Sequence, residues 1–343
     1  MQNGQNLMRN SEKFFLKNNK IPLLFTSGIL LFAVAFIVSM TSGSADISLK
    51  ELFGEAFLST ANGRILFYVR LPRTLACLVT GGALAVSGGV IQNVLDNKLA
   101  SPGIIGVNAG AGLGVTLITA LGISGGWQTS VTAFLGAFIT VSLVSLIARK
   151  YNFSRGSVIL AGVALNSILN AFSDSLRTFF PEAAVMSNDF RIGDFSAVTY
   201  ERLTPAIIII LITTLILLTL SNELDVLTLG EENARGLGMN TRAVRSAFMT
   251  CAALLAGCAV SIAGLLTFAG LIIPHTVRRF SGNKALQLIP LCFIFGGAFV
   301  CLCDTAARTL FLPYEIPVGI IMAFIGAPFF LFVLIRKKGG HRQ

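Results

Sequence analysis

Few side chains in this sequence could carry out chemistry, and those that could have no partner at a useful spacing. The 343 residues include two histidines, His275 and His341, and six cysteines that all lie in apolar runs. A multi-histidine metal site is therefore excluded, and we interpret the cysteines as free thiols in the core. No H-E-x-x-H occurs, no glycine-flanked serine can pair with a usable histidine, and no glycine is followed by lysine, which excludes a P-loop. These absences predict a chain that is not an enzyme and that holds no metal or cofactor of its own.

The polar residues that do form a pattern lie in a loop in the middle of the chain, residues 221–245. This loop separates two long runs without an ionised side chain. Thr228 and Glu231 have the spacing of a capping box, and Glu231 and Arg235 are i,i+4 partners in the short helix that would follow. Gly236 and Gly238 would then end this helix. A connection between two spans needs only a few residues, so an ordered helix here predicts a surface that binds another protein.

The composition is that of a membrane protein. The chain is 54% hydrophobic and 12% charged, with a mean hydropathy of +0.78, whereas a soluble domain has about 25% charged residues. Uncharged runs of about 20 residues recur along the chain, and each is long enough to cross a bilayer as a helix. A β-barrel would instead show alternating segments of about 10 residues. We therefore predict an all-α polytopic membrane protein with a single transmembrane domain over residues 1–343.

The uncharged runs predict about ten transmembrane helices, one of which crosses only half of the membrane. The expected spans are 21–40, 74–95, 104–121, 127–148, 156–179, 203–222, 246–263, a short helix at 275–280, 286–310 and 316–335. Glycines and Pro274 break the helical pattern between residues 264 and 274, and irregular backbone at this depth is tolerated only next to protein or a water-filled cavity. This break should therefore border the pathway. His275 is interpreted as a residue at a helix start, with a proton relay as the alternative.

The charges are unevenly distributed between the two sides of the predicted membrane domain. One side holds 18 Lys and Arg against 6 Asp and Glu, and the other holds 8 against 10. The basic side should be cytoplasmic, which places there the N-terminal segment 1–20, the loop 221–245 and both termini. This asymmetry explains the formal net charge of +10, so we reject nucleic acid as a partner. On the outer side, 47–58 is expected to be a helix along the membrane surface, and 173–199 to hold a short helix.

From Arg70 onward the sequence resembles the permease subunits of the iron-siderophore, haem and cobalamin ABC importers. The motifs occur in the family's order and are Arg70-Leu71-Pro72-Arg73, Ser87-Gly88 with Gln92, the segments 97–106, 109–111, 160–166, 229–238 and 268–279, Asp304 with Arg308, and the segments 315–319 and 326–328. Two residues depart from the pattern, Lys98 and Leu265, each of which stands where the family usually has proline. Both lie in loops near the inner half of the expected pathway.

The resemblance implies a type II ABC importer fold and a set of partners. Two permease subunits, identical or paralogous, would line one path across a bacterial cytoplasmic membrane, in contact with its lipid. Two cytoplasmic ATPase subunits would bind ATP and Mg²⁺, and an extracytoplasmic binding protein would deliver the substrate. The ATPase would dock on the loop helix, through Leu229, Gly230, Glu231, Glu232, Ala234, Arg235, Leu237 and Gly238.

Three arginines match the family's outer arginines, which receive acidic residues of the binding protein: Arg70, Arg73 and Arg308. The planar guanidinium suits such docking because it can grip a carboxylate with two donors. Taken singly, each arginine could also be an interfacial cation that extends to the membrane surface. Arg308 is also expected to pair with Asp304 at i,i+4.

Residues that could line the pathway are Gln92, Asn166, Asn170, Pro274 and His275. Interhelical hydrogen bonding is an equal alternative for the two asparagines. The expected function is translocation of a ferric siderophore or a similar large metal chelate into the cytoplasm by alternating access.

Two alternatives remain open. One is a cobalamin or haem permease of the same family. The other is a secondary transporter coupled to protons or sodium, which would need ionisable relays at membrane depth. The candidates for such relays are His275, with Asp174 and Asp304 near span ends.

Overall fold

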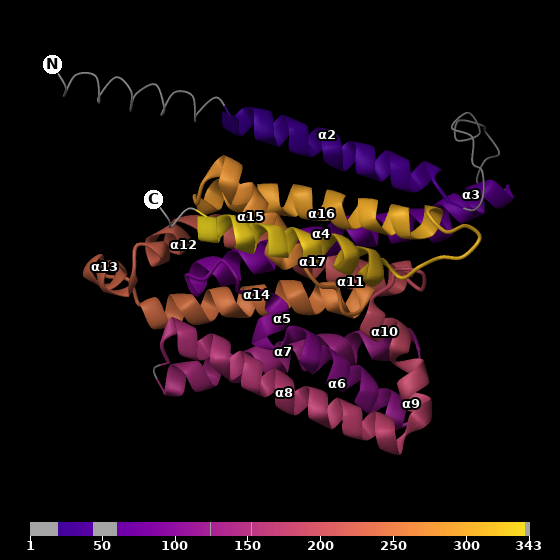
Figure 1. Cartoon of the computed structure of the whole chain (residues 1–343), viewed down its shortest axis with the longest axis horizontal. Coiled ribbons are helices and arrows are strands. Elements are labelled where there is room, and N and C mark those ends of the chain that lie inside the picture. Colours follow the sequence, from indigo (N-terminus) through magenta and orange to yellow (C-terminus); the bar gives the residue numbers. More distant parts are fainter. Residues whose placement is uncertain (1–19, 44–59, 124, 152, 340–343) are drawn as a thin grey trace.

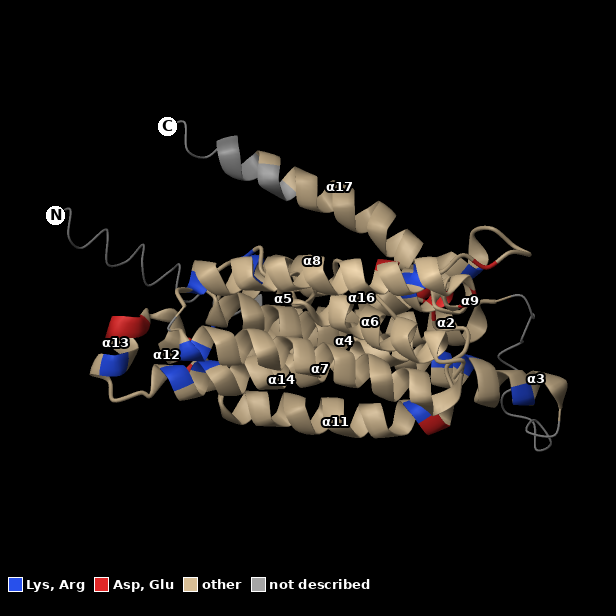
Figure 2. Cartoon of the chain, turned by 90° about the horizontal axis from the view of Figure 1, so that it is seen from below, with Lys and Arg blue, Asp and Glu red and all other residues tan. Residues whose placement is uncertain are grey.

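The computed structural model of the chain describes residues 20–43, 60–123, 125–151 and 153–339. Within these residues every regular element is a helix. The long helices lie side by side (Figure 1), and charged side chains gather at the two ends of the bundle while its middle is almost uncharged (Figure 2). An uncharged middle between two charged ends is the pattern of a bundle that crosses a bilayer. The helix expected at 47–58 and nearly all of the segment 1–20 lie outside the described residues.

Seven helices in the described part are long and apolar enough to cross a membrane. They are α2 (Lys20–Thr41), the continuous α3, η3 and α4 (Ala61–Ile65, Leu66–Arg70 and Leu71–Val94), α7 (Gly126–Lys150), α8 (Arg155–Phe179), α11 (Tyr200–Thr219), α14 (Thr241–Ala263) and α16 (Ala285–Thr309). Three further units accompany them: α5 with α6 (Pro102–Ile105 and Val107–Ala120), α15 (Ala269–Ser281) and α17 (Val318–Gly339). The predicted all-α polytopic fold is confirmed, and these units account for the expected spans.

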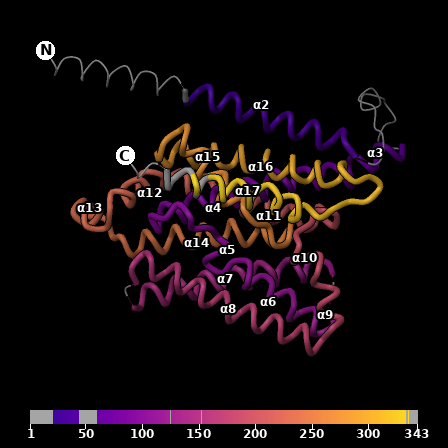
Figure 3. Tube along the Cα trace, viewed as in Figure 1, coloured from indigo at the N-terminus to yellow at the C-terminus, as the bar shows by residue number. Residues whose placement is uncertain are grey.

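Helix α4 lies in the interior of the bundle and is buried along almost its whole length. It packs against α14, α15 and α16, whereas α2 and α8 are largely uncovered within the chain (Figure 3). A Cβ on Gly88 would lie 1.8 Å from the Gly270 carbonyl oxygen of α15, and one on Gly81 would lie 2.3 Å from the Gly296 carbonyl oxygen of α16. Small residues allow this close approach of backbones, which drives helix association in lipid. The glycines of α4 therefore set the positions of α15 and α16.

Two of the crossings are interrupted. Gly106, with φ +114°, separates α5 from α6, and the turn between α14 and α15 contains Gly264 at φ +72° and Phe268 at φ +67°. Because α15 begins directly after Phe268, the expectation of a short helix that starts at His275 is wrong. Pro274 lies inside this helix rather than before it.

Short helices lie at both ends of the bundle. Helices α9 (Pro181–Met186) and α10 (Asn188–Ile192) follow α8, so the helix expected within 173–199 is present as two pieces. At the opposite end, α12 (Ser221–Thr228) and α13 (Glu231–Gly236) connect α11 to α14, and α13 projects from the bundle (Figures 1 and 3). Helix α2 begins and α17 ends at this same end (Figure 1). We call the two ends the α13 end and the α9 end.

Candidate functional site

The helix predicted in the central loop exists as α13, but its start differs from the prediction. Thr228 is the last residue of α12, and its hydroxyl donates to the Asp225 carbonyl of its own helix. It therefore does not cap α13, and the expected capping box of Thr228 and Glu231 is wrong. The chain turns instead at Gly230, whose φ of +102° strains any residue with a side chain.

Helix α13 ends as its glycines predict. Gly238 has φ +82°, its N–H donates to the Arg235 carbonyl at 2.9 Å, and the Met239 N–H donates to the Ala234 carbonyl at 3.1 Å. These two bonds form a Schellman motif. The next residue, Asn240, caps α14 with its side chain, so a short and ordered connection joins α13 to α14.

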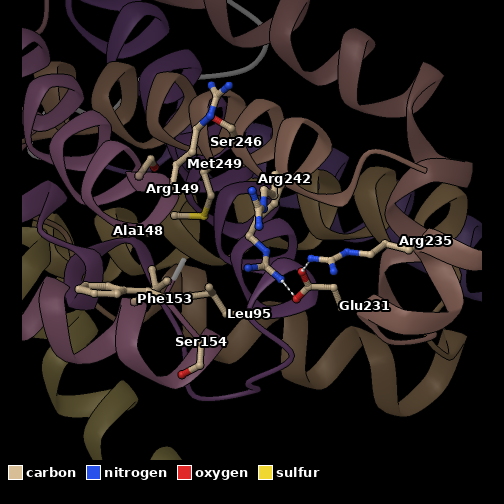
Figure 4. Close-up of a pocket in the computed structure, with 13 residues that line it drawn as sticks. Leu95, Ala148, Arg149, Phe153, Ser154, Glu231, Arg235, Arg242, Ser246 and Met249 are labelled. Carbon is tan, nitrogen blue, oxygen red and sulfur yellow. Dashed lines mark hydrogen bonds and ion pairs between the residues drawn. The ribbon is translucent and has the colours of Figure 1, made fainter. Parts of the chain in front are cut away.

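Glu231 is held between two arginines (Figure 4). Its carboxylate pairs with Arg235 at 2.5 Å, which is the predicted i,i+4 partner, and with Arg245 of α14 at 3.1 Å. Partial burial opposes ionisation of Glu231, but Arg245 and Arg235 outweigh it and hold the pKa of this carboxyl below its usual 4.5. The charged Glu231 therefore fixes α13 to the start of α14. Arg245 lies 14 residues along the chain, at no spacing that a short helix pattern would indicate.

Exposed apolar side chains flank α13, although α13 lies beyond the uncharged middle of the bundle. Leu229 and Leu237 are 57% and 68% exposed, whereas Ala234 is fully buried. Glu232, on the first turn, is exposed as well. Exposed leucines beside charged groups are typical of a surface that contacts another protein. The eight residues predicted to couple to an ATPase thus lie together on and beside the projecting α13, where Ala234 faces inward and Glu232, Arg235, Leu229 and Leu237 are exposed.

Bonds from α12 connect this surface to the long helices. Asp225 of α12 accepts a hydrogen bond of 2.8 Å from the Ala285 N–H at the start of α16. Arg155 at the start of α8 donates to the Leu227 carbonyl of α12 at 3.3 Å and pairs with Asp96, after α4, at 3.0 Å. A displacement of α12 and α13 would therefore act on α4, α8, α14 and α16 together.

At the α9 end, Arg73 and Asp304 form a buried ion pair. The Arg73 guanidinium of α4 lies 3.0 Å from the Asp304 carboxylate of α16, with side chains 8% and 0% exposed. Arg73 also pairs with Glu315, before α17, at 2.8 Å, and lies 3.9 Å from Asp194, after α10. Arg308 pairs with Asp304 at 3.0 Å, as its i,i+4 spacing predicts. This cluster ties α4, α16 and the segments next to α10 and α17 together.

The three arginines predicted to dock a binding protein are all buried within the chain. Besides its pair with Asp304, Arg308 donates to the Ser39 hydroxyl at 3.0 Å. Arg70 donates to the Met40 and Thr41 carbonyls at 2.9 and 3.0 Å, where α2 ends. Desolvated guanidiniums with internal partners are placed to hold helix ends, so this burial counts against direct docking on the arginines.

Gln92 and Pro274, two of the predicted pathway residues, lie in the packed interior. Proline lacks an N–H, which leaves the Gly270 carbonyl, four residues earlier, without its helical partner. The Gln92 side chain donates to that carbonyl over 3.5 Å. Gln92 thus compensates for the proline across the contact between α4 and α15.

The two asparagines of α8 differ in their surroundings. Asn166 donates to the Gly103 and Ile104 carbonyls of α5 at 3.0 and 2.9 Å. Asn166 therefore makes interhelical hydrogen bonds, which is the alternative to a pathway role that the sequence left open. Asn170, one turn later, is exposed on α8 and keeps an accessible side chain.

His275 is half-buried on α15 and lines a small pocket with Lys98, Phe329 and Phe330. Lys98 is one of the two departures from the family pattern, and it lies where the loop after α4 meets α15 and α17. His275 is therefore part of a junction between three elements rather than a helix start.

The other departure, Leu265, makes a contact that proline could not make. Its N–H donates to the Phe190 carbonyl of α10 at 2.8 Å, and next to it the Asp194 N–H donates to the Ala263 carbonyl at 2.9 Å. The break between α14 and α15 is thereby joined to the short helices of the α9 end.

Comparison with known proteins adds a decisive observation. Residues 30–336 match the FecCD transport family. The chain belongs to this family. This FecCD permease is 33% identical over 326 residues to the iron-uptake system permease protein FeuC of Bacillus subtilis. The alignment covers 91% of this chain and 97% of FeuC. The permease is 32% identical over 322 residues to the vitamin B12 import system permease protein BtuC of Yersinia pseudotuberculosis, covering 92% and 93%.

Solved structures share the fold. One is an ABC transporter ascribed to the metal-chelate type, solved in an inward-facing conformation. It matches with a TM-score of 0.82 and 31% sequence identity, and the match covers 92% of this chain and 99% of that structure's chain. PsaBC from Streptococcus pneumoniae matches with a TM-score of 0.56 at 18% identity over 79% and 92%, and shows the fold alone. FecCD permeases are non-catalytic transmembrane subunits without cofactors, and ATP is bound by a partner ATPase. The chain is therefore a multi-pass membrane subunit and not an enzyme, as the missing P-loop predicts.

Proposed function

We propose that this FecCD permease carries a ferric siderophore or a similar large metal chelate into the bacterial cytoplasm, driven by two ATPase subunits. It would pair with a second permease, identical or paralogous, and receive its substrate from an extracytoplasmic binding protein. The α13 end, with both termini, would face the cytoplasm, since its loops carry the excess of Lys and Arg. FeuC, an iron-uptake permease, supports chelated iron as the cargo, and BtuC supports cobalamin as the alternative.

The exposed surface of α8 carries this proposal. Helices α2 and α8 are the two long spans least covered by the rest of the chain, but they expose different residues. Exposed side chains of α2 include Leu23, Leu30 and Ile37, which suit lipid. Helix α8 also exposes large apolar residues, including Leu160, Val163 and Ile168. Towards its α9 end, however, it exposes a group of small and polar residues that includes a carboxylate: Ala164, Ser167, Asn170, Ala171, Asp174 and Ser175.

Polar side chains on a membrane span are costly in lipid and normally face protein or a water-filled path. We therefore infer that this part of α8 meets the pathway and the second permease. Asn170 is the pathway candidate that lies on it. The nearly uncharged middle of the bundle (Figure 2) would bind an anionic chelate weakly and so allow its release.

The contacts at the α13 end suggest how ATP would act. A partner ATPase would bind α13 through Leu229, Leu237 and Glu232. Movement of α13 would pass to α14 through the Glu231–Arg245 pair and to α8 through Arg155. Tilting of α8 would then open the path to one side of the membrane at a time.

The buried arginines would serve the binding protein indirectly in this proposal. Arg73 fixes Glu315, whose side chain is 45% exposed, just before α17. The binding protein would contact the outer surface of the α9 end. Arg70, Arg73 and Arg308 would hold that surface in shape from within, and their guanidiniums would not touch the binding protein.

The cargo can be tested with the complete transporter in lipid vesicles. Radioiron-labelled catecholate and hydroxamate siderophores and labelled cobalamin would be offered with the binding protein, the ATPase and ATP. We expect ATP-dependent uptake of a ferric siderophore that unlabelled siderophore competes away and cobalamin does not. Preferential uptake of cobalamin would replace the proposed cargo with the alternative.

A further inference from the structure

A basic pocket of about 230 Å³ opens beside α13 (Figure 4). It lies among the last turn of α7, the start of α8, α13 and the start of α14. The charged side chains that line it are Arg149, Arg235, Arg242, Arg245 and Glu231. Four arginines against one glutamate leave a clear excess of positive charge. Such an excess would favour a bound anion.

Several donors of this pocket have no partner among the described residues. Arg149 and Arg242, which are both exposed to solvent, form neither an ion pair nor a side-chain hydrogen bond with the described residues. Arg245 uses Nη2 for Glu231, but its Nε is buried without a hydrogen-bond partner, and the Ser145 hydroxyl of α7 is in the same situation. An anion with several acceptor oxygens would satisfy the two buried donors, the Arg245 Nε and the Ser145 hydroxyl. The accessible guanidiniums of Arg149 and Arg242 could pair with its charge, because guanidiniums bind phosphate oxygens with good geometry.

The rest of the pocket points to a lipid as the source of the anion. The remaining lining is largely apolar and includes Leu95, Ala148, Phe153 and Met249. Beside it, Leu146 and Tyr151 at the end of α7 are exposed, and tyrosine is typical of the boundary between lipid and water. A free phosphate would meet the arginines but leave the apolar lining uncovered.

We propose that this pocket binds the phosphate of an anionic phospholipid in the leaflet at the α13 end. Arg149, Arg242 and the Nε of Arg245 would hold the phosphate, and the apolar lining would contact the start of the acyl chains. Basic pockets between membrane helices are known to suit such head groups. Because Arg245 also pairs with Glu231, the bound lipid would stiffen the attachment of α13 to α14. With the orientation of the proposed function, this leaflet is the cytoplasmic one.

Native mass spectrometry of the delipidated full chain tests the proposal. The chain would be titrated with phosphatidylglycerol and, separately, with phosphatidylcholine. We expect the wild type to retain phosphatidylglycerol selectively. In the double variant Arg149→Gln with Arg242→Gln, the affinity for this lipid should fall by about tenfold or more, because charge-assisted hydrogen bonds are lost. The matched control is Arg279→Gln with Lys284→Gln, which removes two exposed cations outside the pocket and should retain the lipid as the wild type does.

A second variant separates loss of binding from loss of folding. Ser145→Leu fills the pocket without changing the charge and should also abolish selective retention. Addition of phosphatidylglycerol should raise the thermal midpoint of the wild type and leave that of Ser145→Leu unchanged. Equal retention of both lipids by the wild type, or unchanged retention in both pocket variants, overturns the proposal. Displacement of the lipid by inorganic phosphate or ATP, with the same rise in thermal midpoint, would show a soluble-anion site and overturn the assignment to lipid.

The retention measurement needs no ATPase, binding protein or cargo. Its failure would therefore leave the proposed importer function in place. Failure of siderophore uptake would likewise leave the lipid site in place.

Discussion

Arg73 and Asp304 lie 231 residues apart in the sequence, yet they meet at 3.0 Å in a buried ion pair between α4 and α16. Loss of the Asp304 carboxylate would leave the buried Arg308 without its ion-pair partner and Arg73 with Glu315 as its remaining close one. A buried charge left without compensation costs about 3–5 kcal/mol. Asp304→Asn should therefore destabilise the chain by about this amount in chemical unfolding measured in micelles.

Glu315→Gln is the matched control for Asp304→Asn, because it makes the same chemical change in another partner of Arg73. The Glu315 side chain is 45% exposed, so its loss should cost less than about 1 kcal/mol. Equal effects of the two variants would show that the buried pair does not determine the stability of this end.

Two adjacent glycines of α4 provide a test of the helix packing. A Cβ on Gly88 would lie 1.8 Å from the Gly270 carbonyl oxygen, whereas the nearest atoms to a Cβ on Gly89 are at 3.7 Å. Gly88→Ala must push α15 away from α4 and should abolish transport and lower the thermal midpoint. Gly89→Ala, which adds only ordinary contacts, should leave both nearly unchanged. A Gly88→Ala variant with normal midpoint and uptake would contradict the close approach.

The attachment of α13 can be tested by charge reversal. Glu231→Lys places a cation beside Arg235 and Arg245, so α13 should detach from α14 while the chain still inserts in the membrane. We expect the ATPase activity of the reconstituted complex to lose its dependence on cargo, and uptake to fall at least tenfold. Glu201→Lys, which reverses an exposed charge at the α9 end, is the control. Normal cargo-dependent ATPase activity in Glu231→Lys would argue against the coupling role of α13.

The lowered pKa of Glu231 sets the direction of a pH effect. A carboxyl with a lowered folded pKa stabilises the folded chain above its ordinary pKa of 4.5, and this stabilisation is lost as the pH falls through the lower folded value. The difference in unfolding free energy between wild type and Glu231→Gln should thus be constant from neutral pH to about 5 and vanish in stronger acid. The carboxyl is partly exposed, so the difference should be at most about 1 kcal/mol. A difference that disappears above pH 5 would contradict the lowered pKa.

Much of the fold follows from local patterns. Uncharged runs locate the spans, and Gly236 and Gly238 of the central loop predict where α13 ends. The break after α14 is also visible in the sequence. The helix predicted after this break, however, starts too late, at His275 instead of Ala269. A proline normally starts or ends a helix, and the Gln92 contact that accommodates Pro274 within α15 comes from a distant span.

The candidate sites show where local patterns stop being informative. Glu231 and Arg235 pair at helical spacing, but Arg245 joins them only through the turn at Gly238. Arg73 has the motif position of an exposed docking residue, and its burial depends on Asp304, which no short spacing connects to it. Long-range partners decide whether a charge is exposed or internal, and the sequence alone does not show them.

The most direct test of the importer function is uptake of a radioiron-labelled ferric siderophore into vesicles that hold the permease with or without its ATPase. The binding protein would be added on the α9 side and ATP on the α13 side. We predict uptake that requires both the ATPase and ATP and that does not respond to a pH gradient. Uptake by the permease alone, driven by a pH gradient without any ATPase, would contradict an ATP-driven importer and indicate a secondary transporter.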